Sequence, residues 1–167
     1  MKEKIFRNYL ELNSLNELNE VKSPLKDYFV TLVDPIDFQL NKFFYKNIGR
    51  DYQWVDRLTW TDLDWTKFVS DKRLFTYILK NKSEIAGYFE LLVNKDKKES
   101  ELAYFGILNE YFGNKFGGYL LSEAIKHSFT LGCVRIWAHT CSLDHKNALA
   151  NYLSRGMKIF KTETLIR

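Results

Sequence analysis

The sequence has few of the features that mark exported, membrane-embedded or disulfide-rich proteins. Its 167 residues include only two cysteines and two prolines, and no apolar run approaches the roughly 20 residues of a transmembrane helix. The first twelve residues alternate charged and apolar side chains, unlike a signal peptide. We therefore expect a cytoplasmic protein with no membrane partner.

The two cysteines cannot pair if their segment is extended. Cys133 and Cys141 lie in a stretch with the composition of a strand. At about 3.3 Å per residue their Cα atoms would stand roughly 26 Å apart, whereas a disulfide needs less than about 7 Å. Two unpaired thiols fit a reducing compartment.

Charge of one sign is also lacking. The chain has 25 basic and 21 acidic residues, for a net charge of +4. The densest lysine run, at 95–98, shares its loop with Asp96, Glu99 and Glu101, so it does not form the basic stripe of a nucleic-acid binder. With 46% hydrophobic residues and no linker or repeat, the sequence predicts a single domain over residues 1–167, either a monomer or a homodimer.

The periodicity of apolar residues predicts an α+β domain around a mixed sheet. Thr61 and Asp64 have the spacing of a capping box at a helix start, and Asp144 is predicted to cap the last helix. The expected order is a strand, two helices, three antiparallel strands, a helix, a strand, a helix and a strand. The corresponding ranges are 5–12, 37–47, a helix from 61, strands at 73–80, 85–93 and 101–108, a helix after the loop 111–118, a strand at 134–140, a helix ended by Gly156, and a strand at 157–162.

A glycine-containing loop at 111–118 opens a predicted helix. Glycines at 113, 117 and 118 would let the backbone approach a phosphate, and Lys115 adds a positive charge. A helix N-terminus exposes free N–H groups and is an anion site. The loop has neither the Walker pattern nor Gly-x-Gly-x-x-Gly. The alternative is that the glycines only form a tight turn between strand and helix.

Several motifs in the same order resemble the GNAT (Gcn5-related N-acetyltransferase) superfamily. Phe112, Lys115 and Gly117 occupy its Arg/Gln-x-x-Gly-x-Gly/Ala positions, of which only Gly117 matches strictly. The segment 148–157 is similar to the signature Ala-x-x-x-Tyr-x-x-x-Gly-Phe, with Met157 in the last position. The stretches 50–58, 103–107 and 139–145 resemble a bacterial subgroup with poorly defined substrates.

The resemblance implies a mostly antiparallel sheet flanked by about four helices, and N-acetyl transfer from acetyl-CoA without a metal. It also implies that the strand ending at Ile107–Leu108 splays from its neighbour to pair with the pantetheine arm, with the Leu108 N–H facing the thioester oxygen. His145, at the first position of the last helix, matches a place where relatives contact CoA. The implied CoA-binding residues are Ile107, Leu108, Phe112, Gly113, Asn114, Lys115, Phe116, Gly117, Gly118 and His145.

Acetyl transfer needs an acid for the leaving thiolate and a base for the amine. Tyr152 holds the family position of the acid; the alternative is an aromatic that only packs the helix. For the base, Glu101 is expected on the strand face of Ala103, Phe105 and Ile107. His139, on an adjacent strand, titrates near neutral pH and is an equal candidate. Water alone is the third option.

Cys141 shares a predicted strand face with His139, which suggests a Cys–His nucleophile. The resemblance favours direct attack without an acyl-enzyme. A metal site from His139, Cys141 and His145 has no standard ligand spacing.

The acceptor amine is expected among aromatic and acidic residues between the first two helices, with Trp54, Asp51 and Tyr45 as the candidates. The alternative is that the aromatic residues belong to the core. The acceptor is a small-molecule amine or a peptide or protein amine. The competing function is a non-catalytic acyl-CoA-binding or interaction domain of the same fold.

Overall fold

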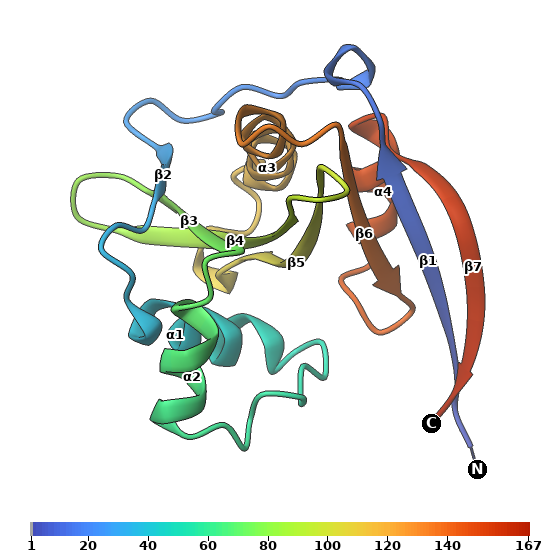
Figure 1. The fold of residues 1–167 in the computed structure, drawn as a ribbon, viewed down its shortest axis with the longest axis horizontal. Helices are drawn as coiled ribbons and strands as arrows, with labels where there is room; N and C mark the ends of the chain where they lie inside the picture. Colours follow the sequence, from blue (N-terminus) through green and yellow to red (C-terminus); the bar gives the residue numbers. More distant parts are fainter. Residues whose placement is uncertain (1) are drawn as a thin grey trace.

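The computed structural model describes residues 2–167. In this range the elements are, in chain order, β1 (Lys4–Leu12), the 3-10 helix η1 (Leu15–Glu17), β2 (Phe29–Leu32), α1 (Phe38–Gly49), α2 (Asp62–Val69), β3 (Leu74–Lys80), β4 (Ile85–Asn94), β5 (Glu99–Ile107), the 3-10 helix η2 (Asn109–Tyr111), α3 (Phe116–Thr130), β6 (Arg135–Cys141), α4 (Ala148–Ser154) and β7 (Lys158–Ile166). Figure 1 shows their arrangement.

All seven strands form one sheet in the order β2-β3-β4-β5-β6-β1-β7. Only β5 and β6 run parallel, and every other neighbouring pair is antiparallel. The predicted α+β class and mostly antiparallel sheet are therefore confirmed. The predicted order missed β2, a four-residue edge strand with half-exposed and exposed side chains, which gives no apolar alternation.

The helices cover the two faces of the sheet in pairs. Figure 1 shows α1 and α2 below the sheet and α3 above it. Side chains of α3 and α4 share one core cluster with Leu10, Leu91 and Ile136 of the sheet. On the other face, Phe44 and Ile48 of α1 pack against Ile78 and Tyr88. Neither α1 nor α2 extends over β1 and β7. These two strands pair with each other at the edge of the sheet.

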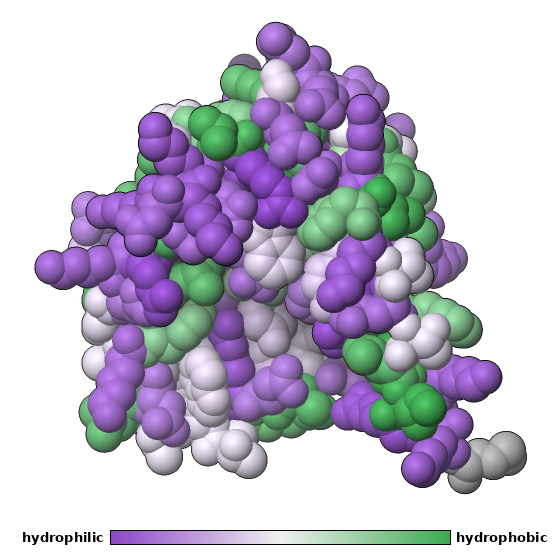
Figure 2. Space-filling model, turned by 45° about the vertical axis from the view of Figure 1, so that its right-hand side comes forward, coloured by the Kyte–Doolittle hydropathy of each residue, from purple (hydrophilic) through white to green (hydrophobic). Residues whose placement is uncertain are grey.

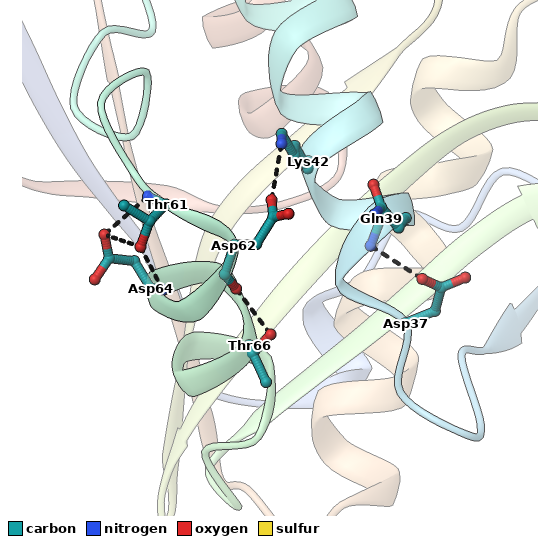
Figure 3. Close-up of polar contacts among 7 residues, drawn as sticks. All are labelled: Asp37, Gln39, Lys42, Thr61, Asp62, Asp64 and Thr66. Atoms are coloured by element: carbon teal, nitrogen blue, oxygen red, sulfur yellow. Dashed lines mark hydrogen bonds and ion pairs between the residues drawn. The ribbon is translucent and has the colours of Figure 1, made fainter.

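The starts of α1 and α2 follow from their caps (Figure 3). The Gln39 amide donates to the Asp37 side chain at 3.0 Å. At α2 the predicted capping box is present, with Thr61 N–H donating to Asp64 and the Asp64 N–H donating back to Thr61. An ion pair of 3.0 Å between Lys42 and Asp62 joins α1 to the start of α2.

The end of α3 is as predicted, because Gly132 follows it with a φ of +94°. The predicted start of α4 is wrong. The helix begins at Ala148, and its N-cap Asn147 makes no side-chain capping bond. The Asp144 carboxylate instead accepts from the Thr140 hydroxyl at 2.5 Å and the Cys141 amide at 2.9 Å. Asp144 therefore organises the turn after β6 and does not cap the helix.

Candidate active site

The sheet opens between its two parallel strands. β5 and β6 pair only from Glu99 to Glu101 against Arg135 to Trp137. Beyond Glu101, β5 continues against β4 as far as Ile107, and β6 continues against β1. The predicted splay of the strand that ends at Ile107 is therefore confirmed, and it leaves backbone groups of β5 without a strand partner on that side.

A cleft of about 1260 Å³ occupies this opening. Its walls are β5 and β6, the loop between α1 and α2, the N-terminus of α3, the residues before and within α4, and the ends of β1 and β7. Figure 2 shows the corresponding face of the molecule hollowed near its centre. The volume exceeds the range of about 300–1,000 Å³ usual for one small ligand, so there is room for two reactants.

The α3 end of the cleft has the character of an anion site. Gly113 has a φ of +86°, and Lys115, the N-cap, has a φ of +63° and makes no side-chain capping bond. Gly113 adopts its left-handed backbone conformation without a steric penalty, because glycine has no Cβ. The first amides of this 15-residue helix therefore have no side-chain partner at the cap and point towards the cleft with the positive end of the helix dipole.

Arg155, which the motif comparison missed, lies over this helix start. A Cβ added at Gly118 would collide with its Nη1 atom, so the glycine makes room for the guanidinium. The Arg155 Nε is buried without a hydrogen-bond partner, and Asn151 Nδ2 donates to the Gly117 carbonyl at 3.0 Å. The signal was available in the sequence, because Arg155 directly precedes Gly156 in the signature segment.

The cleft lining contains most of the predicted CoA-binding residues. They are Ile107, Phe112, Gly113, Lys115, Phe116, Gly117, Gly118 and His145. Two expectations are corrected. Asn114 is exposed and lies outside the lining. Leu108 is 4% exposed, and its N–H donates to the Ala86 carbonyl at 2.8 Å, so this amide does not face a thioester.

His145 lies in the turn before α4, not at the first helical position as predicted. Its Nδ1 accepts from the Asn147 amide at 3.0 Å. Its ring meets the Phe112 ring edge-on, at 5.5 Å between centroids. Phe112, one of the two residues that depart from the family motif, is 45% exposed. Together these two rings connect the glycine loop to the turn after β6.

Tyr152, the predicted acid, extends from α4 into the cleft and is 7% exposed. Its ring lies 6.3 Å from that of Phe105 on β5. Burial, and secondarily the charge of Asp144, raises the pKa of the phenol well above its usual value. The hydroxyl is therefore protonated at neutral pH, and the raised pKa makes it a weaker proton donor than a tyrosine in water.

His139 and Cys141 both line the cleft from β6. Desolvation of the ring by the surrounding protein lowers the pKa of His139 below 6.5, and the positive charge of Arg7 lowers it further. The imidazole is therefore neutral at pH 7 and free to accept a proton. Burial raises the pKa of the Cys141 thiol, which disfavours the thiolate that a nucleophilic cysteine requires.

Glu101 lines the cleft, but on a different strand face from the one predicted. Between β4 and β5, Glu90 pairs with Tyr104 and Leu91 pairs with Leu102. Ala103 therefore has no partner on β4 and is a bulge residue. The bulge breaks the alternation, and Glu101 shares the face of Tyr104 instead of that of Phe105 and Ile107. Burial raises the pKa of the Glu101 carboxyl, and the charge of Arg57 opposes that rise.

The structure brings only one of the three predicted acceptor residues into the cleft. Trp54 lines it, with its ring 4.7 Å from that of Tyr104. Tyr45 is fully buried and its hydroxyl accepts from the Arg57 amide at 3.0 Å, so it is a core residue. Asp51 is exposed outside the lining and accepts from Asn109 at 2.9 Å. The acidic residue of this loop that does line the cleft is Asp56.

Arg57 anchors the loop that forms this wall. Its guanidinium donates to both oxygens of Glu90, at 3.0 and 3.2 Å, and the two residues are 7% and 0% exposed. Asn41 also donates to Glu90, at 2.8 Å. Arg57 Cζ lies 4.1 Å from the Phe68 ring centroid and 4.3 Å from that of Tyr104. Sequence patterns gave no sign of this cluster, because its members come from one loop and four separate helices and strands.

Among residues 2–167, no group of three or more histidine, cysteine, aspartate or glutamate side chains is placed to hold a metal ion. Cys133 and Cys141 are free cysteines. Over the same range, no helix combines the length and the apolar composition needed to cross a membrane.

The fold is similar to that of several solved acetyltransferases. A GCN5-related N-acetyltransferase from Sphaerobacter thermophilus aligns with a TM-score of 0.71 and 12% identity, over 99% of this chain and 52% of that one. The chain thus spans about half the length of that relative. Spermidine N-acetyltransferase from Vibrio cholerae, in complex with CoA and spermine, aligns with a TM-score of 0.63 and 16% identity over 85% and 96% of the two chains.

An aminoglycoside acetyltransferase from an uncultured soil metagenomic sample, in complex with trehalose, aligns with a TM-score of 0.65 and 10% identity, over 77% of this chain and 87% of that one. No curated protein sequence matches the chain. The model of the acetyltransferase (GNAT) family matches residues 38–157, well over half of the sequence. The chain therefore belongs to the acetyltransferase (GNAT) family.

Proposed function

We propose that the protein transfers the acetyl group of acetyl-CoA to the primary amine of a small molecule, by direct attack in a ternary complex. The observation that carries the proposal is the cleft between β5 and β6, which joins an anion site at one end to Tyr152, His139 and Glu101 further along. Membership of the acetyltransferase family supports acyl transfer in general.

The donor is proposed to lie along the open side of β5. Its phosphates would accept hydrogen bonds from the first amides of α3, with Lys115 and Arg155 supplying positive charge. Gly117 supports this placement, because a Cβ there would meet only Asn151 Nδ2, at an ordinary 3.5 Å. Nothing in the protein demands a glycine at this position, whereas close approach of a ligand does.

The chemistry follows from the three ionisable groups. His139 is neutral at pH 7 and takes the proton of the attacking ammonium, directly or through water. Glu101, which has no ion-pair partner among residues 2–167, holds the ammonium in the cleft. The amine nitrogen forms a bond to the thioester carbon, the carbon–sulfur bond breaks, and the Tyr152 hydroxyl gives its proton to the departing thiolate. The nitrogen then gives up its second proton, which restores the Tyr152 hydroxyl.

Small amines are the favoured acceptor class. Two proteins of similar fold are named for the small polyamine spermidine and for aminoglycosides. In this chain Trp54 and Tyr104 provide aromatic faces at the cleft wall, and Asp56 lies beside them. An ammonium group is attracted both to aromatic faces and to carboxylates.

A non-catalytic acyl-CoA-binding domain is the second candidate. The Leu108 amide favours it, because its bond to Ala86 removes one expected donor to the thioester oxygen. Loss of an oxyanion donor lowers turnover without abolishing binding. The two functions share a binding site, so a binding assay followed by a turnover assay separates them.

The experiment is thermal melting with acetyl-CoA or CoA, followed by thiol release over a panel of amines. We expect both ligands to raise the melting temperature, and Arg155→Gln to weaken that effect. Arg50→Gln is the matched control, since Arg50 is exposed outside the cleft. No stabilisation by either ligand would refute both candidates. Stabilisation without thiol release from any amine would favour the binding domain.

We also propose a cytosolic location for the enzyme. The support is the pair of free cysteines, which a reducing compartment maintains. Fractionation of cells that express the protein tests this directly.

A further inference from the structure

The guanidinium of Arg7 lies in the cleft with few partners. Arg7 is on β1, opposite Cys141 of β6, and lines the cleft with it. Within residues 2–167 its side chain makes one hydrogen bond, 3.5 Å from Nη1 to the Tyr9 hydroxyl. The nearest carboxylate oxygen, on Glu163, is 3.8 Å away and is itself engaged by the Tyr9 hydroxyl. A guanidinium has five N–H donors, so most of those of Arg7 are unused.

The neighbouring arginines differ in this respect. Arg135, on the same sheet, donates to Glu11 at 2.7 Å and to Glu99 at 3.1 Å, and it lies outside the cleft lining. Arg57 lines the cleft, but its charge is paired with Glu90 through Nη1, at 3.0 Å, and its guanidinium lies against aromatic rings. Of these three arginines, Arg7 alone lines the cleft without a carboxylate of residues 2–167 at hydrogen-bond distance.

Arg7 is also placed beside the reacting groups. Along β6, Trp137 pairs with Glu101 and Cys141 pairs with Arg7, and His139 lies midway between them. Two residues of a strand span about 6.6 Å. If the amino group of a substrate is held between His139 and Glu101, another group of the same molecule, a few bonds from the nitrogen, would lie towards Arg7. The cleft offers a cation for that substituent and a carboxylate for the amine.

We propose that the acceptor is a small amino acid, whose amine is held by Glu101 and His139 while its carboxylate binds Arg7. This inference rests on the proposed acetyl transfer and names its substrate class. Guanidinium groups bind carboxylates through two parallel hydrogen bonds, which fixes orientation as well as charge. An amine without an acidic group leaves Arg7 with only the Glu163 carboxylate, at 3.8 Å, as a partner, and a polyamine is repelled by the guanidinium.

The test uses matched pairs of an amino acid and its decarboxylated amine, such as lysine with cadaverine and alanine with ethylamine. Assays at about pH 8 keep His139 neutral in every variant, since Arg7 affects its pKa. We expect the amino acid of each pair to have a kcat/KM about tenfold or more higher, the effect of one charged hydrogen-bonded contact. A dipeptide amide, with no carboxylate near its amine, is expected to behave like the decarboxylated amine.

Substitution of Arg7 should remove the preference. Arg7→Gln should bring the two values of kcat/KM close together, mainly through a higher KM for the amino acid, and Arg7→Lys should restore part of the difference. Arg135→Gln is the control and should keep the wild-type ratio. Melting curves establish that each variant is folded. A wild-type preference for the decarboxylated amines or the dipeptide amide, or an unchanged ratio in Arg7→Gln, would overturn the inference.

Binding to the CoA-loaded protein, measured by calorimetry with the same pairs, separates this inference from the proposed function. Tighter binding of the amino acids that depends on Arg7, without turnover, would uphold the Arg7 site and reject the transferase. Turnover without a preference for substrates that carry a carboxylate would uphold the transferase and reject the Arg7 site. Absence of binding and turnover for every amino acid would contradict the inference about Arg7, and absence of turnover for every amine of the panel as well would contradict the transferase.

Discussion

The buried ion pair between Arg57 and Glu90 is expected to control both stability and the shape of the acceptor wall. In Arg57→Met, Glu90 keeps only the Asn41 hydrogen bond for a carboxylate that is 0% exposed. Breaking a buried pair from one side costs about 3–5 kcal/mol, since the remaining charge is uncompensated. For a chain of this size each kcal/mol lowers the melting temperature by about 2–4 °C. The expected drop at pH 7 is therefore about 6–20 °C.

The pH dependence of this loss has a definite sign. Burial raises the pKa of the Glu90 carboxyl and Arg57 opposes the rise, so removing Arg57 raises that pKa further. A group whose pKa is higher in the folded state stabilises the fold at low pH and loses that contribution as the pH rises. The deficit of Arg57→Met relative to the wild type should hence shrink between about pH 7 and about pH 5.

Melting curves over this pH range provide the assay, and Arg73→Met provides the control. Arg73 pairs with Asp71 at 2.7 Å at the surface, so its replacement should leave the melting temperature close to that of the wild type. The double variant Arg57→Met with Glu90→Leu should recover most of the loss, because no unpaired charge remains. Equal melting temperatures for Arg57→Met and the wild type would refute this account of the loop.

Four further substitutions test the reacting groups. Tyr152→Phe should lower kcat by about 100-fold, the usual effect of losing a general acid, while the dissociation constant for CoA stays nearly the same; an unchanged kcat would remove the acid role. In the wild type, kcat should fall as the pH drops through the lowered pKa of His139, below 6.5. His139→Gln should lower kcat and abolish this pH dependence. Glu101→Gln should keep the pH dependence and mainly raise the KM for the amine. Cys141→Ser should retain most of the activity, and a complete loss with a trapped acetyl-enzyme in the wild type would point to covalent catalysis.

Local signals in the sequence predicted the fold well. The capping box of Thr61 and Asp64 and the glycine after α3 are set by neighbouring residues, and both are present in the structure. The start of α4 was mispredicted, because Asp144 finds its partners in Thr140 and Cys141 behind it, and an aspartate before a helix pattern does not reveal that preference. The edge strand β2 lacked a pattern altogether.

The candidate site was predictable in so far as it rests on motifs. The residues that depend on tertiary contacts were not. A bulge at Ala103 places Glu101 on another strand face than the predicted one. Tyr45 is fully buried, but a tyrosine suits a binding surface equally well, so the sequence could not distinguish the two. Arg7 carries no local signal of its own, since its importance comes from the strand register. Arg155 has a place in the signature segment, but its position over the start of α3 depends on the space left by Gly118.

The most direct test of acetyl transfer is mass spectrometry of amines incubated with the protein and acetyl-CoA carrying a heavy-isotope acetyl group. The account predicts an amine that gains the labelled acetyl group on nitrogen, together with one free CoA thiol per product. It also predicts that Tyr152→Phe slows the formation of both equally. Thermal stabilisation by acetyl-CoA without any labelled amine, over a panel that includes amino acids, polyamines and aminoglycosides, would contradict it.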